Sequence, residues 1–366
     1  MKKIKGLALA FVALSITAGV MITGTGCNGS GKGADSTSGE DNTMMGAGSS
    51  FDNPLFSKMF SEYNKTTGLK INYQSIGSGG GIKGLTDKTV DFGASDAPLS
   101  DDQAKAMNAA AIHIPVTAGA VVLSYNLPDL KDTLMLTPDV LAGMFLGDIK
   151  KWNDPKIAAI NKGVKLPDMD ITIAHRADAS GTTNIFTTYL AKISKDWETK
   201  VGKGSSVSWP TATAIGSKGN EGVAGIIKQT PGTIGYIELA YAIQNKMAFA
   251  KMQNKAGNFI TPSIASVTAA ANIDIPADGK VSLTNTEAAD GYPISGLSWV
   301  IIYTEQNYNN RTQDKATKLL KLLQWMIHDG QQYSGALNYA PLSPKAVAVG
   351  DALLKTATYG GKPVLQ

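Results

Sequence analysis

The sequence predicts an α/β protein built from open, doubly wound sheets. From residue 43 onward, short apolar segments of strand character alternate with segments whose apolar residues recur at helical spacing. No repeat of about 20 to 50 residues is present, so neither a solenoid nor a barrel is favoured. At 366 residues, 43% of them hydrophobic, the chain is long enough for two domains with separate cores. We therefore expect two α/β lobes.

The composition narrows the classes of function. The formal net charge of +4 includes Lys2, Lys3 and Lys5, which lie in a segment that we expect to be removed, so 4 − 3 = +1 remains. This balance gives no sign of nucleic-acid binding. One cysteine and three scattered histidines are too few for a disulfide framework or a zinc site. We expect neither a metal nor a cofactor.

The N-terminus has the layout of an export signal. A basic start is followed by an apolar stretch rich in small residues at positions 6–24, so residues 1–26 are predicted to be a signal peptide. A permanent transmembrane anchor is the alternative, although no basic cluster follows the stretch.

The segment after the signal predicts a lipid anchor. Residues 24–27 resemble a bacterial lipobox, with Gly24 where leucine is typical, and Cys27 is then the acylated residue. Residues 27–42 are rich in glycine and serine, which indicates a flexible tether. We expect the folded part on the periplasmic or extracytoplasmic face of a bacterial membrane.

Residues 43–124 are predicted to form the first part of lobe I. A strand that begins at Thr43 leads into a helix that begins at Pro54, so Ser50 and Phe51 lie near the helix N-terminus. The glycine-rich turn at 77–81 opens another helix and offers backbone N–H groups and the Ser78 hydroxyl to an anion. It is not a P-loop, because the Gly-Lys-Ser/Thr triplet is missing. A merely flexible turn is the alternative.

Asp96 follows the next predicted strand. The helix after it is already capped by Ser100 with Gln103, so Asp96 is not needed as a cap. A carboxylate at this edge of a sheet suits an anion site only if the anion carries a proton. A solvated loop aspartate is the alternative, and His113 is interpreted as a core or sheet residue.

Residues 125–290 are predicted to form lobe II around a strand-to-helix turn at 175–182. Ser180, Gly181 and Thr182 offer N–H groups and hydroxyls at the positive end of a helix, and Arg176 adds a fork of donors. We interpret the turn as half of an anion cage. The alternative is that Ser180 is only an N-cap and that Arg176 pairs with Asp178 on the surface. Asn220 is interpreted as the N-cap of a later helix.

Residues 291–366 are predicted to return to lobe I. They contain one strong apolar strand at 297–303 and two amphipathic helices, at 313–326 and 345–355. These elements are too few for an independent domain. Packing them on the first part makes more than one segment cross between the lobes, as a hinge requires.

Five motifs together closely resemble the periplasmic phosphate-binding proteins of Pst-type phosphate ABC transporters. The motifs are Gly46-Ala47-Gly48-Ser49-Ser50-Phe51, Ile76-Gly77-Ser78-Gly79-Gly80-Gly81, Asp91-Phe92-Gly93-Ala94-Ser95-Asp96-Ala97-Pro98-Leu99, Arg176-Ala177-Asp178-Ala179-Ser180-Gly181-Thr182 and Pro231-Gly232-Thr233-Ile234-Gly235-Tyr236. The resemblance implies a type II periplasmic-binding fold, two doubly wound lobes joined by a hinge. It also implies a monomeric, non-enzymatic protein that binds inorganic phosphate and delivers it to a permease and an ATPase.

The resemblance also implies a set of phosphate ligands. They are Ser50, the Phe51 backbone, Ser78, Asp96, Arg176, Ser180, the Gly181 backbone and Thr182. Three positions depart from the family pattern: Ser50 stands where threonine is familiar, Ala179 replaces a glycine, and His175 replaces an arginine. The last change could lower the local positive potential, so it bears on affinity.

Asp96 gives the implied site a basis for selectivity. Phosphate near neutral pH keeps a proton to donate to a carboxylate, whereas sulfate would meet Asp96 as a buried like charge. Sulfate and molybdate are therefore disfavoured, and arsenate stays open. A phosphatase or esterase is the alternative from another class, but no Gly-x-Ser-x-Gly elbow or two-metal cluster is present. A scaffold or adhesin with a vestigial site is a third alternative.

Overall fold

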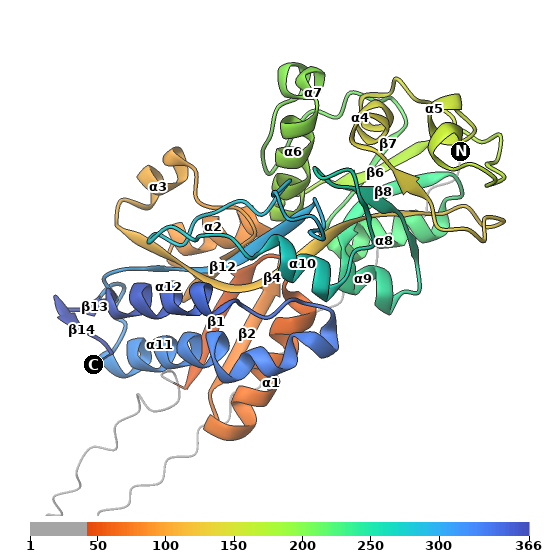
Figure 1. Cartoon of the computed structure of the whole chain (residues 1–366). Helices are drawn as coiled ribbons and strands as arrows, with labels where there is room; N and C mark the ends of the chain where they lie inside the picture. The colour runs from red at the N-terminus through yellow and green to blue at the C-terminus, as the bar shows by residue number, and fades with distance from the viewer. Residues whose placement is uncertain (1–41, 366) are drawn as a thin grey trace, which may run out of the picture. The chain divides into compact units, whose positions relative to one another are not determined.

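The computed structural model of the protein describes residues 42–365 (Figure 1). The predicted signal peptide, Cys27 and nearly all of the predicted tether lie outside these residues. Among the helices that are described, none combines the length and the apolar character needed to cross a membrane.

The described elements alternate between strands and helices along most of the chain. The strands are β1 (Thr43–Gly48), β2 (Lys70–Ser75), β3 (Phe92–Ser95), β4 (Ala111–Tyr125), β5 (Met135–Leu136), β6 (Thr172–Arg176), β7 (Ala214–Ser217), β8 (Thr233–Glu238), β9 (Ala248–Phe249), β10 (Lys251–Gln253), β11 (Phe259–Ile260), β12 (Ser295–Tyr303), β13 (Thr358–Tyr359) and β14 (Lys362–Pro363). The α-helices are α1 (Asn53–Thr67), α2 (Ser78–Thr86), α3 (Asp101–Met107), α4 (Pro138–Leu146), α5 (Pro155–Ile160), α6 (Gly181–Ile193), α7 (Lys195–Lys200), α8 (Gly219–Gln229), α9 (Leu239–Gln244), α10 (Ile264–Ala270), α11 (Gln313–Ile327) and α12 (Pro344–Lys355).

The main sheet has the strand order β2-β1-β3-β12-β4-β8-β6-β7. Two sets of parallel strands, β2-β1-β3 and β8-β6-β7, flank the antiparallel strands β12 and β4. Parallel strands joined through helices are the mark of doubly wound α/β architecture. The predicted fold class is confirmed. The predicted boundaries after residues 124 and 290 stay predictions.

Strand β4 connects the two sets. Its residues 111–120 pair with β12, and its residues 121–125 pair with β8. The structure has one strand of 15 residues with a bulge opposite Ser298 and Trp299, which accommodates Pro115.

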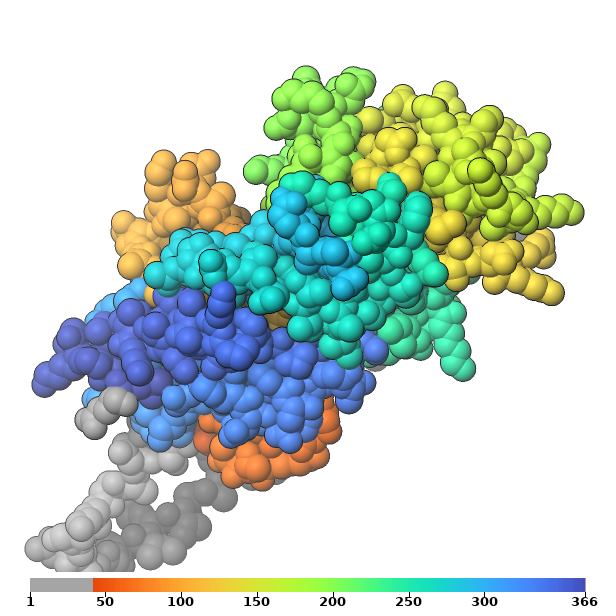
Figure 2. Space-filling view, viewed as in Figure 1, coloured from red at the N-terminus to blue at the C-terminus, as the bar shows by residue number. Residues whose placement is uncertain are grey.

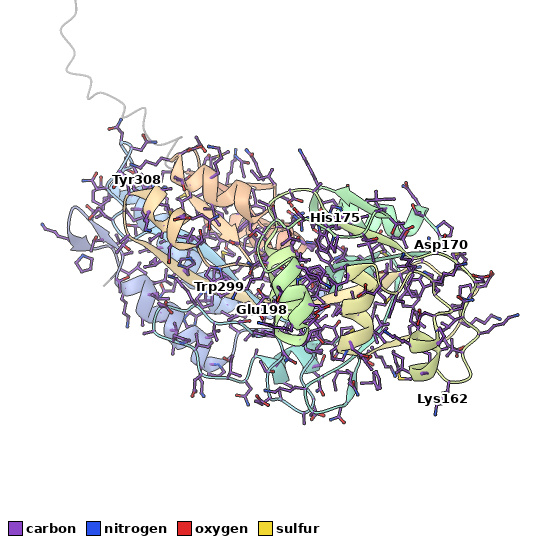
Figure 3. All side chains as sticks on the ribbon, turned by 90° about the horizontal axis from the view of Figure 1, so that it is seen from above. Lys162, Asp170, His175, Glu198, Trp299 and Tyr308 are labelled. Atoms are coloured by element: carbon purple, nitrogen blue, oxygen red, sulfur yellow. The ribbon has the colours of Figure 1, made fainter. Side chains whose placement is uncertain are left out.

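Helices cover the strands with apolar faces. Helix α1 buries Leu55, Met59 and Tyr63 and ends at Gly68, whose positive φ of 74° suits glycine. The C-terminal segment packs on it, with the rings of Tyr63 and Trp325 5.1 Å apart. Figure 2 shows this segment, in blue, beside the orange surface of α1. Side chains fill the space between the ribbons throughout (Figure 3).

Candidate anion-binding site

The predicted ligand residues lie at or directly after the carboxyl ends of β1, β2, β3 and β6, in the connecting loops and in the first turns of the helices that follow. This edge of a parallel sheet is where α/β proteins place ligands. Ser50, Ser78, Asp96, Arg176 and Thr182 are all buried there, each at most 5% exposed. Loops far apart in the sequence thus supply one buried polar cluster.

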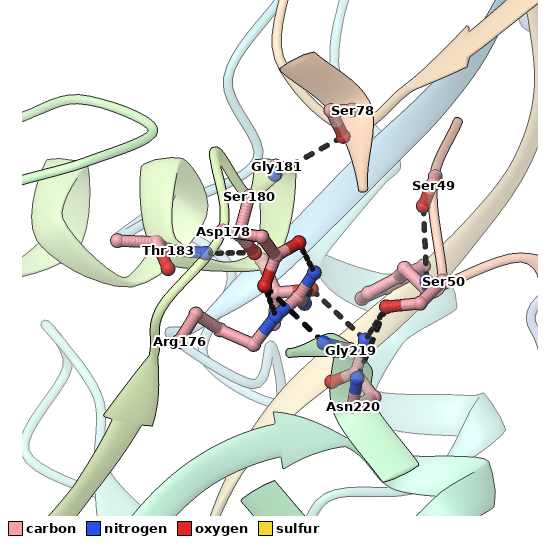
Figure 4. Close-up of polar contacts among 12 residues, drawn as sticks. Ser49, Ser50, Ser78, Arg176, Asp178, Ser180, Gly181, Thr183, Gly219 and Asn220 are labelled. Carbon is pink, nitrogen blue, oxygen red and sulfur yellow. Dashed lines mark hydrogen bonds and ion pairs between the residues drawn. The ribbon is translucent and has the colours of Figure 1, made fainter. Parts of the chain in front are cut away.

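The turn before α2 contacts the turn before α6. The Gly181 N–H donates to Ser78 Oγ at 3.0 Å (Figure 4). The Gly79 N–H donates to the carbonyl of Ala179 at 2.9 Å. A Cβ atom on Gly181 would lie 2.5 Å from Ser78 Oγ and 2.6 Å from Asp96 Oδ2. Only glycine permits this approach.

A second contact joins the loop after β1 to the start of α8. Asn220 donates to Ser50 Oγ from its backbone N at 3.1 Å and from Nδ2 at 2.9 Å, and Nδ2 also donates to Thr182 Oγ1 at 3.1 Å. Its Oδ1 accepts the N–H of Glu238 at 2.9 Å. Asn220 therefore fixes two of the predicted ligand hydroxyls.

Four buried hydroxyls share one property: each accepts hydrogen bonds from the protein, and none donates its own hydrogen to another described residue. Ser50 accepts from Asn220, Ser78 accepts from Gly181 and the Asp96 N–H, Thr182 accepts from Asn220 and Arg176, and Ser180 accepts from Thr183. A hydroxyl has one hydrogen to give. Four O–H donors are therefore available to an acceptor-rich ligand.

Arg176 is held by a fork-to-fork pair with Asp178. Its Nε donates to Asp178 Oδ1 at 2.7 Å and its Nη2 to Oδ2 at 2.5 Å, while Nη1 donates to Thr182 Oγ1 at 3.3 Å. The pair predicted as an alternative is present, but its surface location is wrong, because the two side chains are 1% and 11% exposed. The guanidinium lowers the pKa of Asp178 against the opposing effect of burial.

Two hydroxyl groups orient the carboxylate of Asp96. Its Oδ1 accepts from Ser49 Oγ at 2.6 Å and from Ser298 Oγ at 2.8 Å, whereas its Oδ2 faces Gly181. Burial raises the pKa of Asp96 to about 6, although the two hydroxyls and the charge of Arg176 act to lower it. The carboxyl group therefore has one saturated oxygen and one available oxygen.

The remaining predicted residues are placed as follows. Ser180 caps α6 by accepting the N–H of Thr183 at 3.1 Å, so the predicted cap and a free O–H coexist. The N–H of Phe51, predicted as a ligand donor, is bonded to Ser49 Oγ at 3.0 Å. Its ring is fully buried against that of Tyr339.

A pocket of about 590 Å³ opens beside Asp96. Its lining includes Lys203 and Ser205 from the loop after α7, and Lys280 and Trp299 from the C-terminal part of the chain. Two lysines at this opening favour the approach of anions.

Comparison with known proteins assigns the chain to a family. Residues 33–329 match the model of the PBP superfamily domain. The phosphate-binding protein PstS of Xylella fastidiosa (strain Temecula1) is 44% identical over 308 residues, which cover 83% of this chain and 82% of that protein. The phosphate-binding protein PstS of Haemophilus influenzae is 41% identical over 319 residues, covering 86% of this chain and 93% of that protein. The chain belongs to the PstS family.

Solved structures agree with the PstS family fold. The structure of PfluDING, a high-affinity periplasmic phosphate-binding protein bound with phosphate, superimposes with a TM-score of 0.66 at 20% identity and covers 85% of this chain and 92% of that one. A DING protein gives a TM-score of 0.70 at 20% identity, covering 87% and 96%. These likenesses establish the periplasmic-binding-protein type of fold.

The structure shows the contacts of two residues at which this PstS family member departs from the family pattern, His175 and Ala179. His175 stacks on Trp209 with ring centroids 5.0 Å apart and donates from Nδ1 to the carbonyl of Arg176. Burial lowers the pKa of His175, so it adds no positive charge near neutral pH. Ala179 lies against Gly79, where a second Cβ would come within 2.4 Å.

Sequence reasoning missed several residues around the site. Asn220 was predicted to be an N-cap, but Lys218 takes that position and Asn220 turns into the cluster. Ser49 directly precedes a predicted ligand, and this proximity could have indicated its role. Ser298 lies in an apolar strand, and no local signal connects it to Asp96.

Proposed function

We propose that this chain captures inorganic phosphate between two lobes and delivers it to an ABC importer. The proposed ligands are Ser50, Phe51, Ser78, Asp96, Arg176, Ser180, Gly181 and Thr182. The names of the relatives support phosphate as the ligand, because the PstS proteins of Xylella fastidiosa and Haemophilus influenzae are named phosphate-binding proteins.

One observation carries the proposal: the four buried hydroxyls are committed as acceptors and keep their hydrogens free. A tetrahedral oxyanion supplies the acceptors that these hydrogens need, and Arg176 supplies a positive charge. Desolvating an anion is tolerable only where donors replace water at every oxygen.

Asp96 supports phosphate over a fully ionised oxyanion. Its available Oδ2 is an acceptor when ionised, so it suits a ligand that still carries a proton. Sulfate would place an unprotonated oxygen against this carboxylate in a buried site. Arsenate resembles phosphate in this respect and remains a second candidate ligand.

The bonding of the histidines supports binding rather than hydrolysis. A serine nucleophile needs a base within hydrogen-bond reach. Here His113 accepts the N–H of Leu99, His175 bonds the carbonyl of Arg176, and His328 contacts Asp351. Among the described residues no cluster of metal ligands offers a second route.

The remaining parts of the proposal follow from the sequence and the family. Residues 1–26 act as a signal peptide, Cys27 carries the lipid, and residues 27–42 tether a monomeric body to the extracytoplasmic face of the membrane. The lobes comprise residues 43–124 with 291–366, and residues 125–290. Its partners are the permease and ATPase subunits of a phosphate importer.

Calorimetric titration of the mature protein, freed of endogenous ligand, tests the function. Phosphate should bind and sulfate should bind at least about a hundredfold more weakly. Arg176→Met should abolish phosphate binding, because no other cation within residues 42–365 is bonded to the four hydroxyls. Arg311→Met, which removes the other arginine of the chain, is the matched control and should bind phosphate wherever it remains folded. Hydrolysis of phosphate monoesters, or sulfate binding equal to that of phosphate, would contradict the proposal.

A further inference from the structure

Asp52 is a buried carboxyl group beside the site that the proposed ligand set does not use. Its side chain is inaccessible to solvent. It occupies the N-cap position of α1, yet it accepts no hydrogen bond from the first turn of that helix. Its Oδ2 lies 2.5 Å from Ser298 Oγ, and its Oδ1 is buried with no partner among the described residues. The carboxyl group is therefore turned from the helix toward the sheet.

Ser298 joins this carboxyl group to Asp96. Its Oγ lies 2.5 Å from Asp52 Oδ2 and 2.8 Å from Asp96 Oδ1. A serine hydroxyl has one hydrogen and can donate to only one of the two carboxyls. If both were ionised, one contact would bring lone pairs together between two buried negative charges. Both contacts are satisfied when one carboxyl carries a proton and donates it to Ser298.

The surroundings decide which carboxyl holds the proton. Asp96 accepts from Ser49 and is influenced by the positive charge of Arg176. Ser298 and Ser49 also act to lower the pKa of Asp52, but its Oδ1 has no hydrogen-bond partner among the described residues, and no ion pair within residues 42–365 includes it. Burial, and then the negative charge of Asp96, raise the pKa of Asp52 well above its ordinary value.

The other titratable groups around Asp52 reinforce this assignment. Glu238 is buried, and burial raises its pKa well above its usual range. The hydroxyls of Tyr73, Tyr241 and Tyr339 donate to the carbonyls of Ser49, Ser50 and Phe51. Burial raises the pKa of each phenol, so they stay protonated and neutral. None of these groups offers a positive charge to Asp52.

We propose that Asp52 is a positioning residue: it stays protonated and, through Ser298, orients the ionised carboxylate of Asp96. This inference rests on the proposed phosphate site. Protonated Asp52 donates to Ser298, and Ser298 donates to Asp96 Oδ1. Together with Ser49, this chain saturates Oδ1 and leaves Oδ2 as the ionised acceptor that faces Gly181. Because the site keeps its own proton on Asp52, the proton that Asp96 recognises must arrive with the ligand.

Infrared difference spectroscopy with isotope-labelled aspartate tests the proton directly. At about pH 7.5, the wild-type protein should show the C=O band of a protonated aspartate, and Asp52→Asn should remove it. The label separates aspartate from Glu238. Asp101→Asn, at an exposed position, is the matched control and should keep the band. A wild-type protein without the band, or Asp52→Asn with it, overturns the proposal.

Titration with inorganic phosphate gives a second readout. Asp52→Asn keeps an N–H donor for Ser298, whereas Asp52→Leu has similar size and no donor. The asparagine variant should bind within about threefold of wild type, and the leucine variant about ten- to a hundredfold more weakly. Equal affinities of the two folded variants overturn the proposal. Wild-type protein that fails to bind phosphate contradicts the proposed function instead, and the infrared band still reports the proton on Asp52.

Discussion

Two aspartates flank the same strand, β3, and both are buried, at 6% and 3% exposure, yet they have opposite surroundings. Asp91 precedes the strand and bonds Arg311 at 2.6 Å, Lys315 at 3.2 Å and the Met45 N–H at 2.7 Å. Asp96 follows the strand, and its described hydrogen-bond donors are hydroxyls.

The difference shows that the partners of a buried carboxylate, more than its burial, distinguish a structural role from a binding role. Asp91 is fully paired and has no capacity left for a ligand. Asp96 has no bonded cation among the described residues, so burial raises its pKa to about 6 and one oxygen stays available. The chain has two arginines, and each pairs with an aspartate, but only Arg176 also bonds the hydroxyl cluster.

Removing the paired carboxylate should have the largest effect. Asp91→Asn leaves the guanidinium of Arg311 buried without its partner, so the free energy of unfolding should fall by about 3 to 5 kcal/mol. Phosphate affinity of the folded protein should not change. Urea unfolding and calorimetry measure the two quantities, and a variant as stable as wild type would erase the contrast between the two aspartates.

Removing the unpaired carboxylate should shift selectivity instead. Asp96→Asn replaces an acceptor by an amide that can donate to an ionised oxygen, so the preference for phosphate over sulfate should fall about ten- to a hundredfold. Its stability should not fall, because no cation loses a bonded partner. Competition titrations provide the measurement, and unchanged discrimination would remove Asp96 from the selective role.

The smallest expected effect is the pH dependence of sulfate binding. Protonated Asp96 can donate to sulfate, and with a pKa of about 6 its protonated fraction rises about tenfold between about pH 7 and about pH 5. Apparent sulfate affinity should rise by the same factor as the pH falls. Asp96→Asn is the control and should show no such rise, and flat wild-type affinity over this range would contradict the assignment.

The same pKa shift has a consequence for the protein without ligand. Since folding raises the pKa of Asp96 above its ordinary value of 3.8, the native state binds its proton more tightly than the unfolded state. The contribution of Asp96 to the free energy of unfolding is therefore complete below about pH 4 and is lost as the pH rises through about 6.

Much of the fold and of the site could be predicted because the signals are local. Strands β1, β3 and β8 and helix α6 follow from apolar spacing and caps, and Asp96 could be separated from helix capping because Ser100 and Gln103 form the capping box that the structure contains. The Arg176–Asp178 pair was considered only as an alternative, at the surface, whereas in the structure it is buried.

The rest depends on contacts between distant segments. Ser298 reaches Asp96 across 202 positions because β12 pairs antiparallel with β3, and local pattern cannot reveal that register. Asn220 was misread because a polar residue at a helix start usually caps it, whereas here the side chain links Ser50 to Thr182. Asp52 was overlooked because its partner Ser298 lies 246 positions away in the sequence.

The close approach at Gly181 makes one hydrogen atom a requirement for the contact between two turns. A single methyl group there would act as a wedge between the turn that carries Ser78 and the turn that carries Arg176, since it would overlap both Ser78 Oγ and Asp96 Oδ2. Any substitution of Gly181 is therefore excluded by its volume alone, whatever the charge or polarity of the new side chain.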